Sequence, residues 1–381
     1  MKDNHFDIAV IGAGILGLSH AYHAASQGLR VVLFERNQFA LGASIRNFGL
    51  VWPIGQTPDM LDTALSAREH WIKLAEKARF DLAQTGSLQL AYHEDELHVL
   101  EEFGRHYGHH SYDFELLTAG QVTARFPHIV SAGLKGALLS QTECTVDPRQ
   151  AIQRLGAYMT EIGVDVRFGR TVTHIDMPRV ATFEEEVEVE RLVICSGADF
   201  ETLYPSLMQS SSLTKCKLQM MKAAPIPGFE LGPSLCAGLT LRHYDSFEQC
   251  PSVPLVDGRY DQENIDFRNF GVHVLLSQNA QGELIIGDSH EYGMDLYPFD
   301  RNDIDQLILG YLATFFKPRD LLITERWHGI YPKMTNGETH VVLRPDPGVT
   351  IVNGLGGAGM TLSLGLAERV LEERATPLPN P

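Results

Sequence analysis

The sequence predicts a two-domain α/β protein in which a mixed α/β domain and a domain of antiparallel strands share one site. Three observations support this prediction. A strand, glycine-rich turn, helix and second strand open the chain at 6–35, and short alternating strands separated by proline and glycine begin near 213. A second glycine-rich turn follows a strand at 353–360. The length of 381 residues is enough for two domains and a sizeable core.

The opening unit has the pattern of a Rossmann-like dinucleotide site. Gly12, Gly14 and Gly17 form a G-x-G-x-x-G after an apolar strand, and Glu35 ends the second strand. Gly12 permits a tight turn, Gly14 lets the backbone approach a pyrophosphate, and Gly17 lets the helix pack closely on the sheet. The acid has the position of a ribose-binding carboxylate. The unit therefore predicts an adenine dinucleotide, and by itself it leaves NAD and FAD open.

Composition excludes several classes of function. The formal charge of −17, without a cluster of Lys or Arg, argues against a nucleic-acid partner. It leaves an anionic small substrate possible, because a few local cations can outweigh the net charge within a pocket. No apolar run has the length of a membrane span, and no secretory leader is expected. The five scattered cysteines form no C-x-x-C, so we expect reduced thiols in a cytoplasmic protein and no metal site.

Apolar periodicity and turn residues place the remaining elements. Helices are expected where apolar residues recur at helical spacing, and strands where they alternate or form short buried runs. The expected helices cover 58–79, 93–107, 146–163, 301–316 and 361–373, and the expected strands include 87–91, 164–168, 171–176, 192–195 and 349–352. From 213 onward, 213–225, 225–233 and a hairpin around 279–282 predict an antiparallel sheet.

The segment 41–56 after the second strand is rich in small residues and lacks a helical period. Such a loop can run along a long cofactor and bring Ser44, Arg46 and Asn47 to its polar groups, although an ordinary surface loop has the same composition. In the middle of the chain, a buried strand ends in the small-residue turn 196–198. This is the form expected of a second dinucleotide contact.

Taken together, the N-terminal motif, LVICSGA at 192–198 and GLGGAGMTLSLGLAE at 354–368 resemble the D-amino-acid oxidase/glycine oxidase/sarcosine oxidase superfamily of FAD enzymes. The resemblance covers essentially the whole chain, and it selects FAD over NAD. It implies an FAD-binding domain made of 1–80, 145–212 and 326–381, and a substrate-binding domain made of 81–144 and 213–325.

In such enzymes the last glycines remove side chains where the backbone passes the flavin, and the following helix points its N-terminus at the pyrimidine end of the ring. The predicted FAD-binding residues combine this turn with the earlier motifs. They are Gly12, Gly14, Ile15, Gly17, Glu35, Arg36, Ser44, Arg46, Asn47, Gly49, Val172, Ser196, Gly197, Gly354, Gly356, Gly357, Gly359, Met360 and Thr361.

Two positions depart from the family pattern. WHGIYP at 327–332 resembles the family's W-x-G-x-R-P, but Tyr331 stands where amino-acid oxidases place an arginine that clamps the carboxylate. No cysteine follows Cys250, whereas sarcosine-oxidase-like members link FAD to a late cysteine. The resemblance therefore implies noncovalent FAD and puts an α-amino acid substrate in doubt.

The loop GASIRNFGLVWPIGQ most resembles a subgroup associated with bacterial phosphonate breakdown. That resemblance implies oxidation of 2-aminoethylphosphonate or its N-methyl derivative to phosphonoacetaldehyde plus ammonia or methylamine. Dioxygen, or another electron acceptor, would reoxidise the flavin. Replacement of the clamping arginine at Tyr331 fits such a substrate, because its anionic group is tetrahedral and lies one carbon further from the nitrogen.

The substrate-binding residues expected on these grounds come from the segment around 327–333, from the loop 41–56, here the flavin loop, and from the second domain. No catalytic base is assigned. Some of the cations Arg46, Lys217, Arg242 and Lys333 are expected to converge on a phosphonate. Lys333 can also be a turn residue, Trp52 a core residue and His243 a surface histidine. The expected set is Tyr331, Lys333, Trp52, Gln56, His243, Arg242 and Tyr260.

Two other functions stay open at this point. The same fold can oxidise an α-amino or 2-hydroxy acid, and the chain can also be an FAD subunit that passes electrons to a partner without a substrate of its own. An RNA-modifying flavoprotein is disfavoured by the acidic charge.

Overall fold

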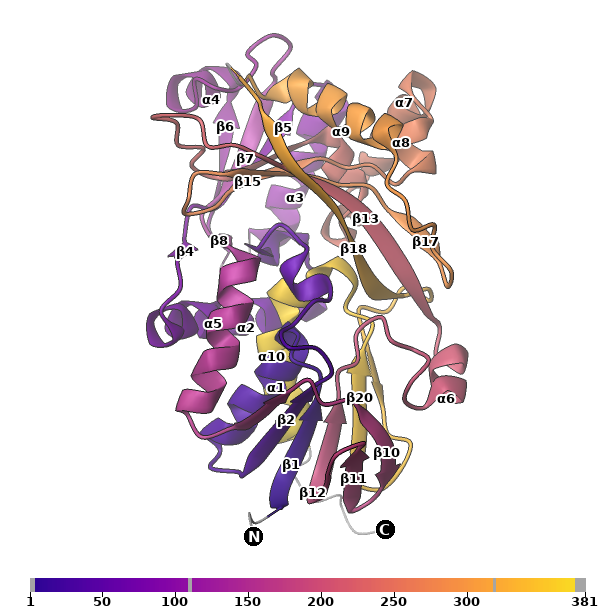
Figure 1. Cartoon of the computed structure of the whole chain (residues 1–381). Coiled ribbons are helices and arrows are strands. Elements are labelled where there is room, and N and C mark those ends of the chain that lie inside the picture. The colour runs from indigo at the N-terminus through magenta and orange to yellow at the C-terminus, as the bar shows by residue number, and fades with distance from the viewer. Residues whose placement is uncertain (1–3, 109–111, 318–319, 374–381) are drawn as a thin grey trace.

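The computed structural model describes residues 4–108, 112–317 and 320–373, which form two lobes joined by several chain crossings (Figure 1). An eight-stranded sheet lies in the lobe that carries the N-terminus, and a nine-stranded sheet lies in the other. A small three-stranded sheet of β3 (Leu50–Val51), β4 (Leu82–Ala83) and β8 (Cys144–Val146) lies between them. Among the described residues, no helix is both long enough and apolar enough to span a membrane.

The first sheet is built on parallel strands, as the opening unit predicts. β1 pairs in parallel with β2 and β12, β2 continues to β9, and β12 continues to β20. Valine and isoleucine dominate the central strands because both faces of the sheet are covered. The strands are β1 (His5–Ile11), β2 (Val31–Glu35), β9 (Asp165–Phe168), β10 (Val172–Asp176), β11 (Arg179–Thr182), β12 (Glu186–Ile194), β19 (Val341–Leu343) and β20 (Val349–Asn353).

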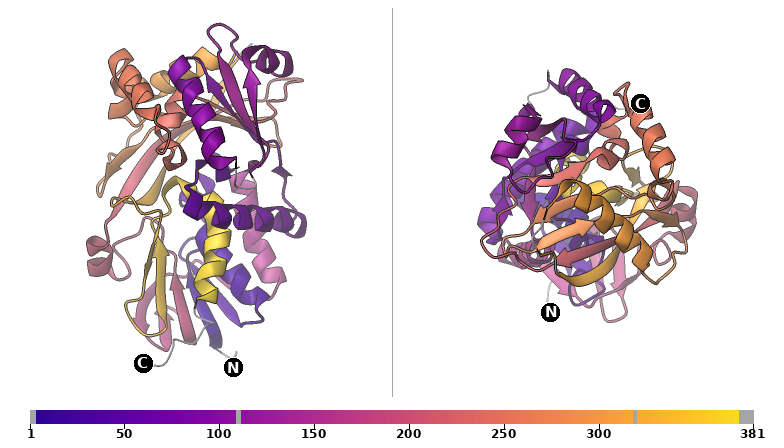
Figure 2. Two further views of the ribbon diagram at one scale, coloured as in Figure 1. Left: turned by 180° about the vertical axis from the view of Figure 1, so that it is seen from behind. Right: turned by 90° about the horizontal axis from the view of Figure 1, so that it is seen from above.

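Four helices cover one face of this sheet: α1 (Ile15–Ser26), α2 (Pro58–Ala78), α5 (Pro148–Glu161) and α10 (Gly359–Glu372). The view from behind in Figure 2 shows them, with α10 in yellow. The closest approach between α10 and α2 is at Gly365, where a Cβ would lie 2.2 Å from the carbonyl oxygen of Thr63. Trp71 of α2 is fully buried, and its indole N–H donates a 2.7 Å hydrogen bond to the carbonyl oxygen of Met360. The opposite face carries a separate apolar cluster, to which α6 (Pro205–Ser210) contributes.

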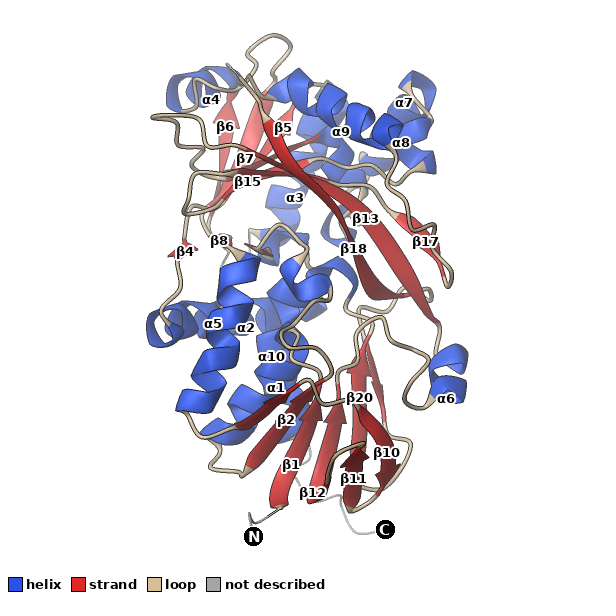
Figure 3. Ribbon diagram, viewed as in Figure 1, coloured by secondary structure: helices blue, strands red, loops and turns tan. Residues whose placement is uncertain are grey.

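The second sheet has the order β17, β13, β16, β15, β14, β5, β7, β6, and β18 pairs with β13. Most pairs are antiparallel, as predicted, but β14 runs parallel to β5. Helices cover the outer part of this lobe (Figure 3). The elements are β5 (Ser87–Ala91), β6 (Phe114–Thr118), β7 (Gly136–Ser140), β13 (Leu213–Ala223), β14 (Ser234–Ala237), β15 (Leu275–Gln278), β16 (Leu284–Gly287), β17 (Glu291–Gly293), β18 (Ile323–Met334), α3 (Glu94–Tyr107), α4 (Ala119–Arg125), α7 (Val253–Glu263), α8 (Asp266–Asn269) and α9 (Asn302–Phe315).

The antiparallel pair β13–β18 connects the two lobes, and it crosses diagonally between them in Figure 1. Its register pairs Leu213 with Met334 at the lower end and Ala223 with Ile323 at the upper end. β18 belongs to the second sheet up to Met334, so the boundary expected at 326 falls inside a strand. The segment 225–233, expected as a strand, has no strand in the structure.

The glycine at the α2–α10 contact gives a test of the packing. Ala at position 365 would place a methyl group against the backbone of α2, and overpacking of this kind costs about 1–3 kcal/mol. Gly310 is the matched control, because it is an exposed glycine inside α9 with no atom within 4 Å of an added Cβ. We expect urea unfolding of the FAD-loaded protein to show a lower midpoint for Gly365→Ala. Gly310→Ala should be unchanged or more stable, since Ala favours helix by about 1 kcal/mol. Equal midpoints for the two variants would contradict this packing.

Candidate active site

A cavity of about 480 Å³, here the dinucleotide cavity, lies over the carboxyl ends of β1, β2, β12 and β20. Ligands of open α/β sheets bind at this edge of the sheet. The glycine turn after β1 and the turn after β12 lie on its wall. The turn after β20 and part of β18, Ile330 to Pro332, close the far end. Three segments that are distant in sequence therefore form one elongated site.

The N-terminal glycines are required by close contacts between backbones. Gly12 has a φ of +102°, and a Cβ there would lie 2.4 Å from the carbonyl oxygen of Cys195. A Cβ on Gly17 would lie 1.8 Å from the carbonyl oxygen of Gly12, so Gly17 allows α1 to begin directly above the turn. Ser44 accepts a 2.9 Å hydrogen bond from the backbone N–H of Ile15. The result is a cradle at a helix N-terminus without side chains in the way, as a pyrophosphate needs.

Glu35 is held at the end of β2 with its carboxylate toward this cavity. Its oxygens accept hydrogen bonds from the backbone N–H of Ala13 (2.9 Å) and from the backbone and side-chain N–H groups of Asn37 (3.0 Å each). A carboxylate has about four acceptor positions. Capacity therefore remains for a ribose hydroxyl, and the side chain is already oriented before a ligand enters.

The structure places most of the predicted FAD-binding residues around this cavity. Asn47, Gly357, Met360 and Thr361 instead line two smaller adjoining cavities. Those on the wall of the dinucleotide cavity are Gly12, Gly14, Ile15, Glu35, Arg36, Ser44, Arg46, Val172, Ser196, Gly197, Gly354, Gly356 and Gly359.

Gly17 and Gly49, also predicted to bind FAD, line none of these three cavities. Gly17 serves the packing of α1, as described above. Gly49 has a φ of +73°, and a Cβ there would lie 1.9 Å from the carbonyl oxygen of Val146. Its role is therefore the close approach of β3 to β8.

The flavin end of the site is held by the turn after β20 and the start of α10. The helix begins at Gly359, two residues earlier than expected, after the short 3₁₀ turn η5 (Gly356–Ala358). Thr361 accepts a 2.9 Å hydrogen bond from the backbone N–H of Trp52, which fixes the flavin loop to α10. The indole nitrogen of Trp52 is buried without a partner in the described structure, and this residue lines a cavity of about 140 Å³, here the side cavity. A buried donor without a partner is the kind of group that a bound cofactor satisfies.

The flavin loop is also tied to the second lobe through a buried acid. Glu143 accepts a 3.1 Å hydrogen bond from the backbone N–H of Ile54 and a 2.9 Å hydrogen bond from the Ser87 hydroxyl. The Tyr112 hydroxyl donates to the same carboxylate. Burial raises the pKa of Glu143. The loop is therefore held by Thr361 of α10 and by Glu143 in the connection between β7 and β8.

A third cavity of about 110 Å³, here the inner cavity, lies beside the flavin end and under the second sheet. Leu218 and Met220 of β13 form its apolar side. Tyr331 lines both the inner and the dinucleotide cavity and is only 6% exposed. Burial raises the pKa of Tyr331 well above its ordinary value, so its phenol is neutral and can donate a hydrogen bond. This is the position where a small substrate can meet a flavin.

The structure separates the predicted substrate residues into two groups. Tyr331, Lys333, Trp52, Gln56 and His243 line the inner or the side cavity.

Arg242 and Tyr260 lie outside all three cavities, and their assignment is corrected. Arg242 forms ion pairs at 3.3 Å with Asp257 and Asp261. Tyr260 is buried, and its hydroxyl hydrogen-bonds to Glu96 (2.8 Å) and Tyr311 (2.9 Å). Both side chains therefore stabilise the outer helices of the second lobe.

Four cationic side chains were expected near a bound phosphonate, and two of them line the cavities. Arg46 lines the inner cavity and Lys333 the side cavity, and neither has a carboxylate partner within 4.0 Å in the described structure. Lys217 is buried, donates to the carbonyl oxygens of Tyr297 and Phe299, and pairs with Asp300 at 3.2 Å. Lys217 and Arg242 are therefore not available to a substrate.

His273, Asp288 and His290 line the inner cavity, although none of them was predicted to bind substrate or cofactor. The sequence feature that could have identified them is the hairpin of β15 and β16, because they lie at its two outer ends. His273 precedes the first strand by two residues, and Asp288 and His290 directly follow the second. In an antiparallel hairpin these two ends lie side by side. The backbone pair between His273 and Asp288 confirms that they do.

Replacement of Glu35 tests the dinucleotide site. Glu35→Gln keeps the shape but removes the negative charge that accepts these hydrogen bonds, and bonds to charged groups contribute about 1.5–3 kcal/mol. We expect the Kd for FAD to rise at least tenfold, measured by titration of the apoprotein with FAD. Glu190→Gln, at an exposed position on β12, is the control and should leave the Kd unchanged. An unchanged Kd for Glu35→Gln would exclude a role for this acid in cofactor binding.

Comparison with known proteins agrees with this geometry. The crystal structure of glycine oxidase from Geobacillus kaustophilus matches with a TM-score of 0.78 at 20% identity, over 97% of this chain and 95% of that one, which shows a shared fold. Gamma-glutamylputrescine oxidoreductase of Escherichia coli (strain K12) is 24% identical over 96% of this chain and 83% of its own length. Glycerol 3-phosphate dehydrogenase of Caloramator mitchellensis is 25% identical over 50% of this chain, which spans only 42% of that protein.

A family model described as DAO, FAD dependent oxidoreductase, matches residues 7–373, which is nearly the whole chain. The match includes the glycine turns after β1 and β20, both of which line the dinucleotide cavity. The cofactor of this family is FAD, and the donor set and the side-chain-free cradle described above fit it. The chain belongs to the DAO family of FAD-dependent oxidoreductases.

Proposed function

We propose that this protein oxidises a small amine that carries a phosphonate group, such as 2-aminoethylphosphonate or its N-methyl derivative. The products are phosphonoacetaldehyde and ammonia or methylamine, and dioxygen is reduced to hydrogen peroxide. The carbon next to the nitrogen loses a hydride equivalent and the nitrogen loses a proton, which leaves an imine. Water then adds to the imine and releases the amine. When bound, FAD supplies the two-electron acceptor.

The residues of the chain bind and orient the substrate and exclude water. Leu218 and Met220 give the inner cavity an apolar side, and the hydroxyl of Tyr331 is a neutral donor between this cavity and the dinucleotide cavity. The reacting amine must be neutral, so its proton has to leave before oxidation. We assign no general base among the described residues.

The observation that carries the phosphonate proposal is the pair Arg46 and Lys333. Among the described Lys and Arg residues that line the three cavities, Arg36, Arg170 and Lys215 are within 4.0 Å of carboxylates, whereas these two are not. Arg46 donates to the carbonyl oxygen of His328 and Lys333 lies over the ring of Tyr292, so neither positive charge is neutralised by a carboxylate, which favours an anionic ligand. The neutral Tyr331, in place of a carboxylate-clamping arginine, supports an anion other than the α-carboxylate.

The relatives support the coarser part of the proposal. Gamma-glutamylputrescine oxidoreductase matches 96% of this chain, and the name of that protein specifies a polyamine derivative as its substrate. A glycine oxidase shares the fold over 97% of the chain. Oxidation at a carbon–nitrogen bond is therefore the activity that we carry over to this chain.

We also propose that the first sheet with its four helices is the FAD-binding domain and the second sheet with its helices the substrate-binding domain. FAD is bound without a covalent link to cysteine, since all five cysteines lie at or before Cys250 and are buried. Five free cysteines also agree with a reducing compartment such as the cytoplasm.

The test is anaerobic mixing of the FAD-loaded protein with a panel of substrates while the flavin absorbance is followed. The panel contains 2-aminoethylphosphonate, its N-methyl form, glycine, sarcosine and 2-hydroxyglutarate. We expect rapid bleaching by one or both phosphonates and slow or no bleaching by the others. Bleaching by the carboxylates alone would overturn the phosphonate substrate, and bleaching by none would favour an electron-transfer subunit.

A further inference from the structure

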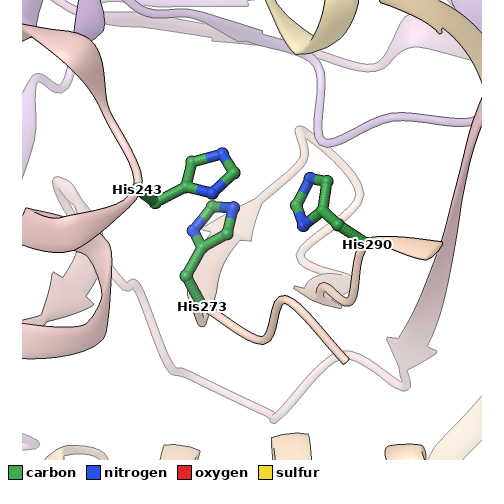
Figure 4. A group of neighbouring side chains, drawn as sticks. All are labelled: His243, His273 and His290. Carbon is green, nitrogen blue, oxygen red and sulfur yellow. The ribbon is translucent and has the colours of Figure 1, made fainter. Parts of the chain in front are cut away.

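Three histidines meet in the inner cavity, and of these only His243 belongs to the predicted substrate-binding residues (Figure 4). The rings of His243 and His273 stack at 3.6 Å between centroids, and the ring of His290 lies 4.6 Å from the first and 5.2 Å from the second. His243 follows the 3₁₀ helix η3 (Gly238–Arg242), whereas the other two flank the β15–β16 hairpin. Arg46 and Tyr331 line the same cavity.

The hydrogen bonds of His290 fix its protonation in the free protein. Its Nδ1 lies 2.9 Å from the carbonyl oxygen of Gly271, which only accepts, so Nδ1 carries the hydrogen. Burial lowers the pKa of His290 to about 4, so at neutral pH its Nε2 carries a lone pair. Burial, with His273, His290 and Lys333 nearby, also holds the pKa of His243 well below its ordinary value. His243 and His290 are therefore neutral unless a nearby negative charge stabilises their protonated forms.

Among the described residues, the inner cavity is lined by one acid, Asp288, and by several neutral or cationic groups. Asp288 lies 3.0 Å from Nε2 of His273 and 3.9 Å from Nε2 of His290. The Nδ1 atom of His273 is buried without a hydrogen-bond partner among the described residues. The other titratable or charged groups around the three rings are Arg46, Tyr244, Tyr292, Tyr331 and Lys333. Asp245 and Glu338 line the side cavity together with His243. On the wall of the inner cavity itself, cationic and neutral donors thus outnumber Asp288.

A shared metal ion is a less suitable occupant. The ligand atoms of the three histidines lie within 4.8 Å of one another, which is short enough for a metal site. However, the ring planes of His243 and His273 are inclined by only 20°, and those of His273 and His290 by 18°. The lone pair of an imidazole nitrogen lies in the ring plane. Rings stacked in this way point their lone pairs side by side and not toward one ion.

We propose that His243, His273 and His290, together with Arg46, bind the tetrahedral oxyanion at the end of the substrate. This inference rests on the proposed function and names the residues that give it specificity. The negative charge of a bound phosphonate stabilises the protonated form of His243 or His290, so its entry is accompanied by proton uptake from solvent, and the imidazole N–H groups donate hydrogen bonds to its oxygens. Asp288, 3.0 Å from Nε2 of His273, is the carboxylate nearest to the cluster.

The inference is tested with ethylphosphonate, which lacks the amine and cannot be oxidised. Binding to the FAD-loaded protein is followed by the flavin absorbance change, and proton uptake is followed with a pH indicator in weak buffer. We expect His290→Gln and His273→Gln each to raise the Kd by roughly tenfold or more, and His290→Gln also to reduce proton uptake. His128→Gln is the matched control, because His128 is partly buried in the same lobe but lines none of the three cavities.

Kinetics distinguish this inference from the proposed function. The cluster variants should lower kcat/KM for 2-aminoethylphosphonate roughly tenfold or more and leave turnover of ethylamine, which lacks the oxyanion, unchanged. Equal losses on both amines, or unchanged ethylphosphonate binding, would overturn the role of the cluster while amine oxidation stands. A stoichiometric metal in the purified protein, lost in both variants, would also overturn it. Failure of the unaltered protein to oxidise any phosphonate would instead refute the proposed function.

Discussion

The pairing of β13 with β18 is the constraint on which the site depends. Its register sets Tyr331 opposite Cys216 and Lys333 opposite Thr214, at the end of the pair nearest to the first sheet. Lys333 also bridges to Leu355 in the turn after β20. A shift of one residue would turn Tyr331 to the other face of the sheet and remove it from both cavities. The pair therefore joins the lobes and at the same time sets which side chains face the flavin end.

The cofactor site also depends on glycine, because its segments approach one another through their backbones. Gly12 meets the carbonyl of Cys195, and Gly354, at a φ of +82°, packs against Met334 at the end of β18. Side chains at these positions would separate β1 from β12 and the last turn from the β13–β18 pair. The same absence of side chains that closes the fold leaves room for a dinucleotide.

Sequence reasoning was most successful where local rules decide the structure. The opening G-x-G-x-x-G, the acid at Glu35 and the helices at 58–79 and 146–163 follow from spacing and periodicity, and the structure has them as α2 and α5 with the cradle beside them. The second lobe was harder, because its short helices between 253 and 269 carry little periodicity.

The positions of individual side chains in the second lobe could not be predicted, because tertiary contacts determine them and local sequence patterns do not contain these contacts. Arg242 and the cavity residue His243 are neighbours in sequence, yet Arg242 forms its ion pairs with two acids of α7, Asp257 and Asp261. His273 and His290 meet only because a hairpin closes between them. A crystal structure of the FAD-loaded protein with ethylphosphonate is the decisive test of an amine oxidoreductase that holds a phosphonate in the inner cavity. The account predicts phosphorus within hydrogen-bonding reach of His290, His273 and Arg46, and a phosphonate bound outside the inner cavity would contradict it.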